Sequence, residues 1–375
     1  MFGRARTAGF SSALPTYHSQ FYHHGSSYAT RAAPPTQTAI ITQPDLQLGI
    51  ANDVPVPRIT ADNMILVRTR SLALFPSPGA VDGTDFAGDV VAVGTAVTQW
   101  KVGDRVFGAV QGGNPSNHQS GAFQEYVPTF ELEVVRIPNS MSYETAASIG
   151  GACITTAAVV IYGSLGPRPL PFSKAPEDPA TVLVYGGSTA SGAMIIQLLK
   201  LSGHVPIATC SPHNFKLVKS RGAETVFDYH SPTCAADIKS HTKNRLKYAI
   251  DCITSPSSVK ICHEALGRMG GKYTAIERIP DLPGLRSVVK RDWVMGMTMV
   301  GRPIDLGKGY TFPVVPEHVK LGFEWRPVCQ RLIDEGHLLP HPIRMLSGGW
   351  NSILEGLDDL KMQKVSGEKL VSTVC

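Results

Sequence analysis

The sequence lacks the cysteine patterns that staple small proteins or hold structural metals. It has seven cysteines in 375 residues, an odd number, and no two of them form a Cys-x-x-Cys pair. This spacing excludes a structural zinc lobe, and the odd count argues against a disulfide framework. We therefore expect reduced thiols in an intracellular protein, at Cys153, Cys210, Cys234, Cys252, Cys262, Cys329 and Cys375.

Long runs of one kind of residue are also missing. No run of Lys or Arg is long enough to indicate a nucleic-acid binder, and the formal net charge of +5 is modest for this length. The best candidate for a membrane span, residues 146–162, is short and is interrupted by Gly150-Gly151 and Thr155-Thr156, so we expect a buried helix there. The 43% content of hydrophobic residues is typical of a soluble globular protein, and the length suggests two domains.

Acidic residues are absent from the first 44 positions. This segment carries Arg4, Arg6 and Arg31 among many Ser, Ala, Tyr and His residues. Such a composition fits a mitochondrial transit peptide. The alternatives are a disordered segment or a wrongly predicted N-terminus, and the chemistry suggested by the rest of the chain favours a cytoplasmic protein.

The rest of the chain is organised around residues 181–200. An apolar run meets the pair Gly186-Gly187, and a helical pattern of apolar residues follows, which predicts a strand, a tight turn and a helix. Helix N-termini present N–H groups and a positive dipole end to an anion. The pattern predicts the diphosphate site of a dinucleotide-binding βαβ unit. An ordinary strand–helix turn is the alternative, because the usual middle glycine before Gly192 is missing.

The second strand of this unit, residues 205–210, ends without an acidic residue. An NAD enzyme usually carries Asp or Glu there to bind the ribose 2′-hydroxyl. Here Ser211 and Asn214 can donate to a 2′-phosphate and His213 and Lys216 add possible positive charge, so we favour NADPH over NADH. The alternative is that Ser211 and Asn214 cap the next helix, a role compatible with phosphate binding.

Two patterns divide the chain. The first third consists of short strand-like runs joined by glycine turns, which predicts a β-rich, barrel-like domain. After a proline-rich linker at residues 163–179, strands and helices alternate, which predicts a doubly wound parallel sheet with strands at 181–185, 205–210, 225–228, 248–251 and 272–276. From about residue 315 we expect helices near 323–334 and 350–362 and a last strand at 369–374, returning to the first domain.

Several sequence blocks occur in one order and together resemble a known family. They are Gly83-Thr-Asp-Phe-Ala-Gly88, Lys101-Val-Gly-Asp-Arg-Val106, Gly121-Ala-Phe-Gln-Glu-Tyr126, the glycine turn, and Lys364-Val-Ser-Gly-Glu-Lys-Leu370. The blocks resemble a medium-chain dehydrogenase/reductase of the zinc-free, quinone-reductase-like branch. Further blocks at residues 185–190, 208–214 and 248–253 are most similar to fungal trans-acting enoyl reductases of polyketide pathways.

The resemblance covers roughly residues 36–375 and implies an α/β fold. It implies a GroES-like, β-rich catalytic domain at residues 36–160 and 316–375, split around a Rossmann NADP-binding domain at 161–315. Residues 1–35 are expected to be a disordered or targeting-like N-terminus. Zinc ligands of related enzymes have no counterparts here, because Gly83 is followed by Thr84-Asp85 and no cysteine precedes Cys153. We therefore expect no metal, which argues against alcohol dehydrogenase chemistry.

The resemblance also implies the site residues. For the cofactor these are Ser188, Thr189, Ala190 and Ser191 at the diphosphate, Ser211, Pro212, His213 and Asn214 at the 2′-phosphate, Tyr229 at the adenosine, Ile276 and Glu277 near the nicotinamide ribose, and Val365 and Ser366 closing over it. For the substrate they are Thr155, Thr156, Ala157, Ala158, Val159, Val160, Ile161 and Tyr162, with Gly296, Met297, Thr298, Met299 and Val300 along the acyl channel. The alternatives are a half-buried Tyr229 at a strand end, buried helix hydroxyls at Thr155-Thr156, and a core strand at 296–300.

One segment departs from the family pattern. Relatives carry a longer segment after the strand that ends here at Leu74, usually with Asn-Pro and a Lys that reaches the cofactor. Here residues 74–79 lead almost directly into Gly83. A missing segment would remove one wall of the nicotinamide pocket and a candidate proton donor, and a faulty gene prediction is the alternative. We therefore assign no catalytic acid.

These features predict an oxidoreductase, and three hypotheses remain open. The first is an NADPH-dependent enoyl reductase that acts in trans, as a monomer, on acyl chains carried by a polyketide synthase (PKS) or by a hybrid with a non-ribosomal peptide synthetase (PKS-NRPS). In this reaction hydride would be transferred to the β-carbon. The thioester carbonyl would carry the enolate charge, and a proton would be added to the α-carbon. The second hypothesis is a reductase of free quinones or enones. The third is an inactive, cofactor-binding protein that docks on the synthase. None involves nucleic acid or a membrane.

Overall fold

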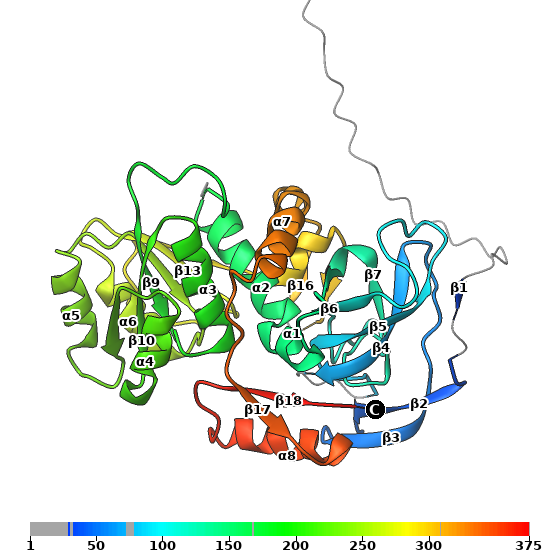
Figure 1. Ribbon diagram of the computed structural model, residues 1–375. Coiled ribbons are helices and arrows are strands. Elements are labelled where there is room, and N and C mark those ends of the chain that lie inside the picture. Colours follow the sequence, from blue (N-terminus) through cyan, green and yellow to red (C-terminus); the bar gives the residue numbers. More distant parts are fainter. Residues whose placement is uncertain (1–28, 31–32, 73–78, 167–168, 308, 375) are drawn as a thin grey trace, which may run out of the picture.

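The computed structural model describes residues 29–30, 33–72, 79–166, 169–307 and 309–374. The chain forms two lobes that meet along the helices labelled α1, α2 and α3 (Figure 1). The transit-like composition of the N-terminus falls almost wholly outside the described residues, as do positions 74–78 of the shortened segment and Cys375.

An antiparallel sheet forms the centre of the β-rich lobe. Its strands follow the order β7-β4-β5-β6-β8, and β1 also pairs with β5. A hairpin of β2 and β3 packs beside it. The bounds are β1 (Ala29–Thr30), β2 (Thr36–Thr42), β3 (Leu48–Pro55), β4 (Met64–Leu72), β5 (Asp85–Val93), β6 (Arg105–Ala109), β7 (Tyr126–Phe130), the 3-10 turn η1 (Glu131–Glu133) and β8 (Val134–Arg136).

Six parallel strands form the sheet of the other lobe, in the order β11-β10-β9-β12-β13-β14. Their bounds are β9 (Thr181–Tyr185), β10 (Val205–Cys210), β11 (Thr225–Asp228), β12 (Tyr248–Asp251), β13 (Gly271–Ala275) and β14 (Val289–Trp293). The strand order reverses between β9 and β12, and ligands bind at such a switch point, outside the carboxyl ends of the strands. The predicted doubly wound parallel sheet is confirmed.

Helices and short 3-10 turns connect these strands. They are α3 (Ala190–Leu201), η3 (Pro212–Asn214), α4 (Phe215–Ser220), α5 (Cys234–His241) and α6 (Pro256–Ala265). Helix α3 is buried along most of its length, because it packs under the sheet and also against α2 of the other lobe. It therefore ties the glycine turn at its N-terminus to the junction of the two lobes.

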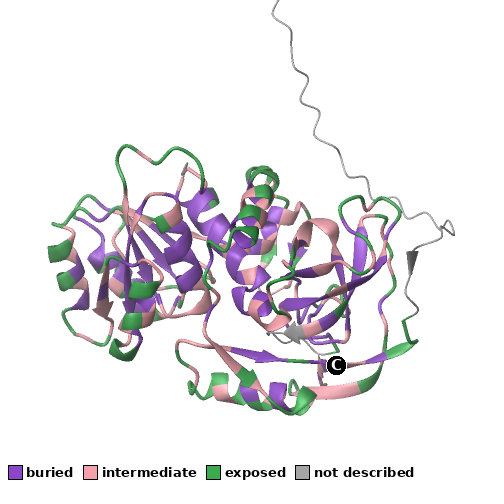
Figure 2. Ribbon diagram, in the orientation of Figure 1, coloured by how far each residue is buried: buried purple, intermediate pink, exposed green. Residues whose placement is uncertain are grey.

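The apolar stretch before the linker is a core segment made of three pieces. They are α1 (Tyr143–Ile149), α2 (Gly151–Ala158) and the π-helix η2 (Val159–Ser164). The segment Tyr143–Ser164 is long and apolar enough to cross a membrane, but 72% of an apolar 18-residue stretch within it is buried inside the protein. Figure 2 shows this stretch largely in the colour of buried residues at the lobe junction, as expected for a core helix of a globular protein.

The last fifth of the chain contributes to both lobes. It contains η4 (Gly296–Val300), β15 (Ile304–Asp305), β16 (Thr311–Phe312), α7 (Pro316–Asp334), β17 (Ile343–Leu346), α8 (Gly349–Lys361) and β18 (Lys369–Ser372). Residues 296–300 form a 3-10 turn, so the alternative of a core strand there is wrong. Strands β17 and β18 form a parallel pair that lies below α1 and the β-rich lobe (Figure 1). Ile353 and Leu357 of α8 pack into the core of the β-rich lobe.

Candidate functional site

The glycine turn after β9 has the geometry of an anion site. Gly186 has a φ of 79°, a conformation that favours glycine. A Cβ atom on Gly192 would lie 2.3 Å from the Gly186 carbonyl oxygen, so α3 can approach the turn this closely only with glycine at that position. The Thr189 hydroxyl accepts a hydrogen bond from the Gly192 N–H at 3.0 Å and caps α3. The other first-turn N–H groups have no partner within a helix and are suited to an anion.

The predicted 2′-phosphate residues lie together beside this turn. The Ser211 hydroxyl donates to the Tyr229 hydroxyl at 3.3 Å. The Asn214 amide nitrogen donates to the Ser366 hydroxyl at 2.9 Å, and His213 Nε2 lies 2.9 Å from the same hydroxyl. In the described part of the chain, neither Ser211 nor Asn214 makes a side-chain capping hydrogen bond. The capping alternative therefore does not account for these residues, and hydroxyl, amide and imidazole groups converge on one place.

The loop before β18 completes this group from the far end of the sequence. Gly367 has a φ of 68°, and a Cβ atom there would lie 2.4 Å from the Asn214 Oδ1 atom. Both facts require glycine at position 367. Val365 and Ser366 line the same pocket as Ser188 and Thr189, so the structure brings the predicted closing loop against the predicted cofactor turn.

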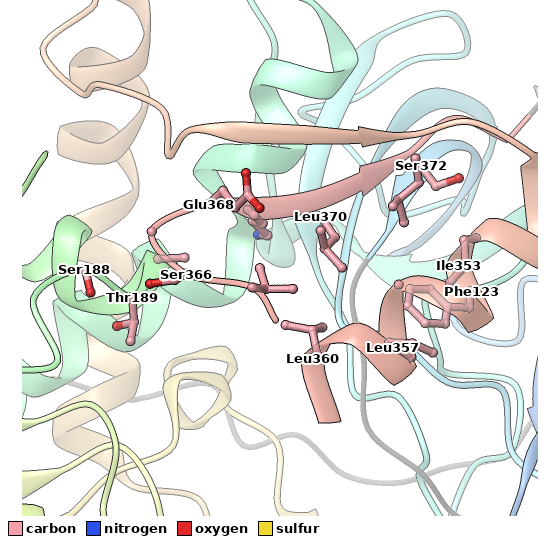
Figure 3. A pocket seen from close by; sticks show the side chains of 16 residues that line it. Phe123, Ser188, Thr189, Ile353, Leu357, Leu360, Ser366, Glu368, Leu370 and Ser372 are labelled. Atoms are coloured by element: carbon pink, nitrogen blue, oxygen red, sulfur yellow. The ribbon is translucent and has the colours of Figure 1, made fainter. Parts of the chain in front are cut away.

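A pocket of about 350 Å³ joins the turn to an apolar groove (Figure 3). At one end lie Ser188, Thr189 and Ser366. At the other end lie apolar side chains from α8, β17, β18 and the segment before β7, and the sequence analysis named none of them. They are Phe123, Leu346, Ile353, Leu357, Leu360 and Leu370. One pocket therefore offers polar groups at one end and an apolar surface at the other.

A buried ion pair that the sequence analysis missed lies beside the turn. Lys369 Nζ lies 2.5 Å from Asp85 Oδ2, and the two side chains are only 10% and 5% exposed. The other oxygen of Asp85 accepts a hydrogen bond from the Ala152 N–H at 2.7 Å. Burial works to lower the pKa of Lys369, but the neighbouring Asp85 and Cys153 outweigh it, so the pKa stands above its usual value. Lys369 lines the pocket as a cation.

Gly150 makes room for this pair between α1 and α2. Its φ is 75°, and a Cβ atom there would lie 2.5 Å from Lys369 Nζ and 2.9 Å from Asp85 Oδ2. The sequence signal was present, since Asp85 and Lys369 both fall in the quoted family blocks. Asp85 and Lys369 are 284 positions apart, so no local sequence pattern could have predicted that they pair.

Two cysteines, the buried Cys153 and the half-buried Cys252, lie beside the turn, and neither has the properties of a nucleophile. The Ser191 hydroxyl donates to Cys153 Sγ at 3.8 Å. Burial raises the pKa of the Cys153 thiol and, more strongly, that of Cys252, which lies next to Thr189. Because the thiolate is the reactive form, both cysteines serve packing.

The predicted substrate segments meet at one point. A Cβ atom on Gly296 would lie 2.7 Å from Thr156 Oγ1, so η4 packs closely on α2. Thr155 and Thr156 are half-buried, and the Thr155 hydroxyl donates back to the Gly151 carbonyl at 2.6 Å. This is the helix-hydroxyl contact that was the alternative for Thr155.

The remaining residues of these segments lie deeper. Ala157, Ala158, Val159, Val160 and Ile161 are fully buried, Thr298 and Met299 are buried, and Met297 and Val300 are half-buried. The Tyr162 hydroxyl lies 2.8 Å from Ser202 Oγ, at the end of α3. Contact of these residues with a substrate stays a prediction.

The predicted nicotinamide-ribose residues follow β13. Ile276 donates its N–H to the Asp251 carbonyl at 3.2 Å. The Glu277 carboxylate accepts hydrogen bonds from the Tyr310 hydroxyl at 2.5 Å and the Arg278 N–H at 2.7 Å. Glu277 is therefore held in place at the carboxyl end of β13, three strands along the sheet from β10.

Within the described ranges, no three His, Cys, Asp or Glu side chains lie close enough together to hold a metal ion. The chain nevertheless matches two family models, one of which is named for zinc binding. Residues 59–139 match the alcohol dehydrogenase GroES-like domain, and residues 190–276 match the zinc-binding dehydrogenase model.

Curated relatives match over almost the whole chain. The trans-enoyl reductase ccsC of Aspergillus clavatus is 42% identical over 359 residues, which covers 91% of this chain and 97% of the relative. The enoyl reductase cheB of Chaetomium globosum is 44% identical over 356 residues, covering 90% of this chain and 94% of the relative. The ccsC alignment of 359 positions is longer than 91% of a 375-residue chain. The relative therefore has residues that this chain lacks, as a shortened segment after Leu74 would produce.

A solved structure has the same fold. An alcohol dehydrogenase superfamily protein from Novosphingobium aromaticivorans matches with a TM-score of 0.71 and 19% identity, covering 91% of this chain and 100% of that chain. The curated relatives share far more of the sequence, and two family models cover parts of both lobes. The chain belongs to the trans-enoyl reductase family of the medium-chain dehydrogenase/reductase superfamily.

Proposed function

We propose that this protein is a trans-acting enoyl reductase that uses NADPH to reduce an α,β-unsaturated acyl thioester carried by a PKS or a PKS-NRPS. The observation that carries the proposal is the group of Ser211, His213, Asn214 and Ser366 beside the glycine turn. It stands in a chain 42% identical to ccsC, a trans-enoyl reductase.

The residues present fit a phosphorylated dinucleotide. The first turn of α3 suits the diphosphate, where a Cβ atom on Gly192 would close the space that the turn occupies. The hydroxyl, amide and imidazole groups at the end of β10 suit the 2′-phosphate. Bound NADPH supplies the hydride. Lys369 places an ammonium group next to the turn, and its charge is balanced by the Asp85 carboxylate.

The substrate end of the proposal rests on the predicted segments around Thr155, Thr156 and Gly296. They meet where η4 packs on α2, and the half-buried Thr156 hydroxyl there can donate to a thioester oxygen as enolate charge develops. The same proposal takes the protein to be a monomer in the cytoplasm, where it meets a synthase through the carrier domain that presents the acyl chain.

The test is NADPH oxidation with a pantetheine-linked 2-methyl-enoyl thioester, run beside NADH. Turnover with a strong NADPH preference is the expected result. Absence of turnover with every α,β-unsaturated pantetheine thioester would refute the proposed reaction. Activity on free enones or quinones far above that on thioesters would favour a reductase of small molecules instead.

One observation favours a second candidate function. The relatives have residues that this chain lacks, and a lost wall of the nicotinamide pocket could leave a cofactor-binding protein that only docks on the synthase. Tight NADPH binding without turnover of any acceptor is its signature. Activity gained on inserting after Leu74 a segment of the length expected from the family pattern would show that the deletion, and not the family assignment, is the cause.

A further inference from the structure

The end of β12 and the loop that follows it have three unusual features within four residues. Asp251 is fully buried although its side chain is a carboxylate, and Ile253 is 47% exposed although its side chain is apolar. Thr254 has a φ of 58°, in the left-handed region that β-branched residues rarely adopt. A buried carboxylate and a strained backbone both cost stability, and strain of this kind clusters at binding and active sites. The loop is therefore a candidate for a functional element.

The Asp251 carboxylate fixes the path of this loop. Its Oδ1 atom accepts hydrogen bonds from the Ile253 and Thr254 N–H groups, both at 2.9 Å. Its Oδ2 atom accepts from the Ser258 hydroxyl of α6 at 2.6 Å and from the Tyr273 hydroxyl of β13 at 2.8 Å. Four donors satisfy the buried carboxylate, and the two backbone contacts offset the strain at Thr254. The loop is therefore tied to the helix that follows it and to the neighbouring strand.

The loop lies where the strand order of the sheet reverses. Asp251 is paired with Tyr185, the last residue of β9, and its carbonyl accepts from the Ile276 N–H after β13 at 3.2 Å. A Cβ atom on Gly186 would lie 3.0 Å from Ile253 Cγ1, so the Ile253 side chain reaches across to the glycine turn. Ile253 therefore lies between the predicted diphosphate turn and the predicted nicotinamide-ribose residues.

A bound dinucleotide would cover the exposed part of Ile253. Dinucleotides lie across the point where the strand order reverses, with one half on each side. The predicted adenosine-side contacts, Ser211 and Tyr229, follow β10 and β11, so the nicotinamide half falls on the side of β12 and β13. An exposed apolar side chain at this place can pack on the ribose or on the face of the nicotinamide ring.

We propose that Ile253 packs on the nicotinamide half of the bound cofactor, and that Asp251 is the positioning residue that holds it there. The inference rests on the proposed use of NADPH, but not on the acceptor that is reduced. Asp251 is too deeply buried to contact the cofactor itself and acts through its hydrogen bonds to the backbone of Ile253 and Thr254. Because the loop is fixed before the cofactor binds, little conformational freedom is lost on binding.

Calorimetric titration with NADPH and with adenosine 2′,5′-bisphosphate tests the contact, because the bisphosphate lacks the nicotinamide half. Ile253→Ala is expected to weaken NADPH binding about fivefold, the effect of losing an apolar side chain of which about half is covered by the ligand, and to leave bisphosphate binding unchanged. Ile253→Leu should keep most of the affinity. Met269→Ala is the matched control, because Met269 is apolar and 85% exposed but precedes β13, at the opposite edge of the sheet.

Asp251→Ala tests the positioning role in the same titrations. It is expected to weaken NADPH binding about as much as Ile253→Ala, and the double variant should bind no more weakly than either single variant, because Asp251 acts through Ile253. If Asp251→Ala does not fold, Asp251→Asn, which keeps the shape of the side chain, takes its place in the comparison. Unchanged binding of the bisphosphate shows that the lobe is folded in each variant.

Three results would overturn the proposal. The first is wild-type affinity for NADPH in Ile253→Ala. The second is an equal loss of NADPH and bisphosphate binding, which would give the loop only a general role in folding. The third is additive losses in the double variant, which would remove the positioning role of Asp251. The expected losses in a protein that reduces no thioester would refute the proposed reaction and leave this inference standing, whereas a wild type that does not bind NADPH would refute both.

Discussion

Selectivity between NADPH and NADH is a property of single side chains at the end of β10. Ser211 donates to Tyr229, and no acidic residue occupies positions 211–214. We predict that Ser211→Asp lowers kcat/KM for NADPH at least tenfold, because a carboxylate repels a 2′-phosphate and accepts from a ribose hydroxyl. The measurement is kcat/KM with both cofactors. Ser211→Asn, which keeps a neutral donor, is the control, and an unchanged cofactor ratio in Ser211→Asp would contradict the assignment.

The ion pair of Lys369 and Asp85 leads to a second prediction about single residues. Lys369→Met leaves the 5% exposed carboxylate of Asp85 without its cation, and breaking a buried pair on one side costs about 3–5 kcal/mol. Urea unfolding measures this loss. Adding Asp85→Leu removes the second charge and is expected to restore much of the stability. A double variant as unstable as the sum of its single variants would show that the two residues do not act as a pair.

At the scale of one element, the turn and helix α3 depend on a close backbone contact. A Cβ atom at Gly192 would lie 2.3 Å from the Gly186 carbonyl, so Gly192→Ala must shift the turn or the helix. We predict a loss of about 1–3 kcal/mol in stability and a large drop in NADPH affinity, measured by nicotinamide fluorescence. Lys200→Ala, at an exposed position in the last turn of the same helix, is the control. Wild-type affinity in Gly192→Ala would exclude this turn as the diphosphate site.

Helices and strands could be predicted where buried residues recur at a regular spacing along the chain. The strands of the Rossmann lobe from β9 to β13 fall where the apolar runs place them, because a strand buried on both faces must be apolar along its length. Strand β14 was missed. It lies at the sheet edge, where Lys290 and Arg291 are exposed and only Val289 is buried, so its sequence has no apolar run to detect.

The helix expected in the apolar stretch before the linker is divided into three helical pieces. The cause of the division lies outside the sequence of this stretch. Residues 143–164 divide into α1, α2 and η2, and the first break falls at Gly150. The glycine there makes room for Lys369 and Asp85, which come from β18 and β5. The break is therefore decided by residues that are distant in the chain.

At the scale of the whole molecule, stability should depend on two buried histidines. Burial, with Arg291 and Arg286 nearby, lowers the pKa of His263 to about 4, and burial with Arg221 and Lys369 does the same for His341. An unfolded histidine titrates near 6.5. Between these values the unfolded chain binds more protons, so stability is fully present above about pH 6.5 and is lost as the pH falls toward 4.

Each histidine is expected to contribute roughly 3 kcal/mol to this loss. Urea unfolding at pH 7 and pH 4.5 measures it, and His341→Gln should reduce the difference between the two conditions. His337→Gln, at an exposed position, is the control. An equal pH dependence in His341→Gln and wild type would show that His341 is not held neutral in the folded protein.

One of the two edges of the six-stranded sheet is relevant to oligomeric state. Strand β14 forms this edge, and its exposed Lys290 and Arg291 discourage edge-to-edge pairing with a second copy. We predict a monomer in light scattering coupled to size-exclusion chromatography. Lys290→Val combined with Arg291→Val should increase dimer formation. A stable wild-type dimer would contradict the role of these charges.

The sequence by itself determined the alternation of strands and helices, the glycine turn, and the lack of an acid after β10. These features are local, because they depend on the period of buried residues and on the backbone freedom of glycine. Only the tertiary structure decided which distant residues meet. Ser366 joins His213 and Asn214, and Lys369 joins Asp85. Such contacts depend on how the lobes and β18 pack, and packing leaves no periodic signal along the chain.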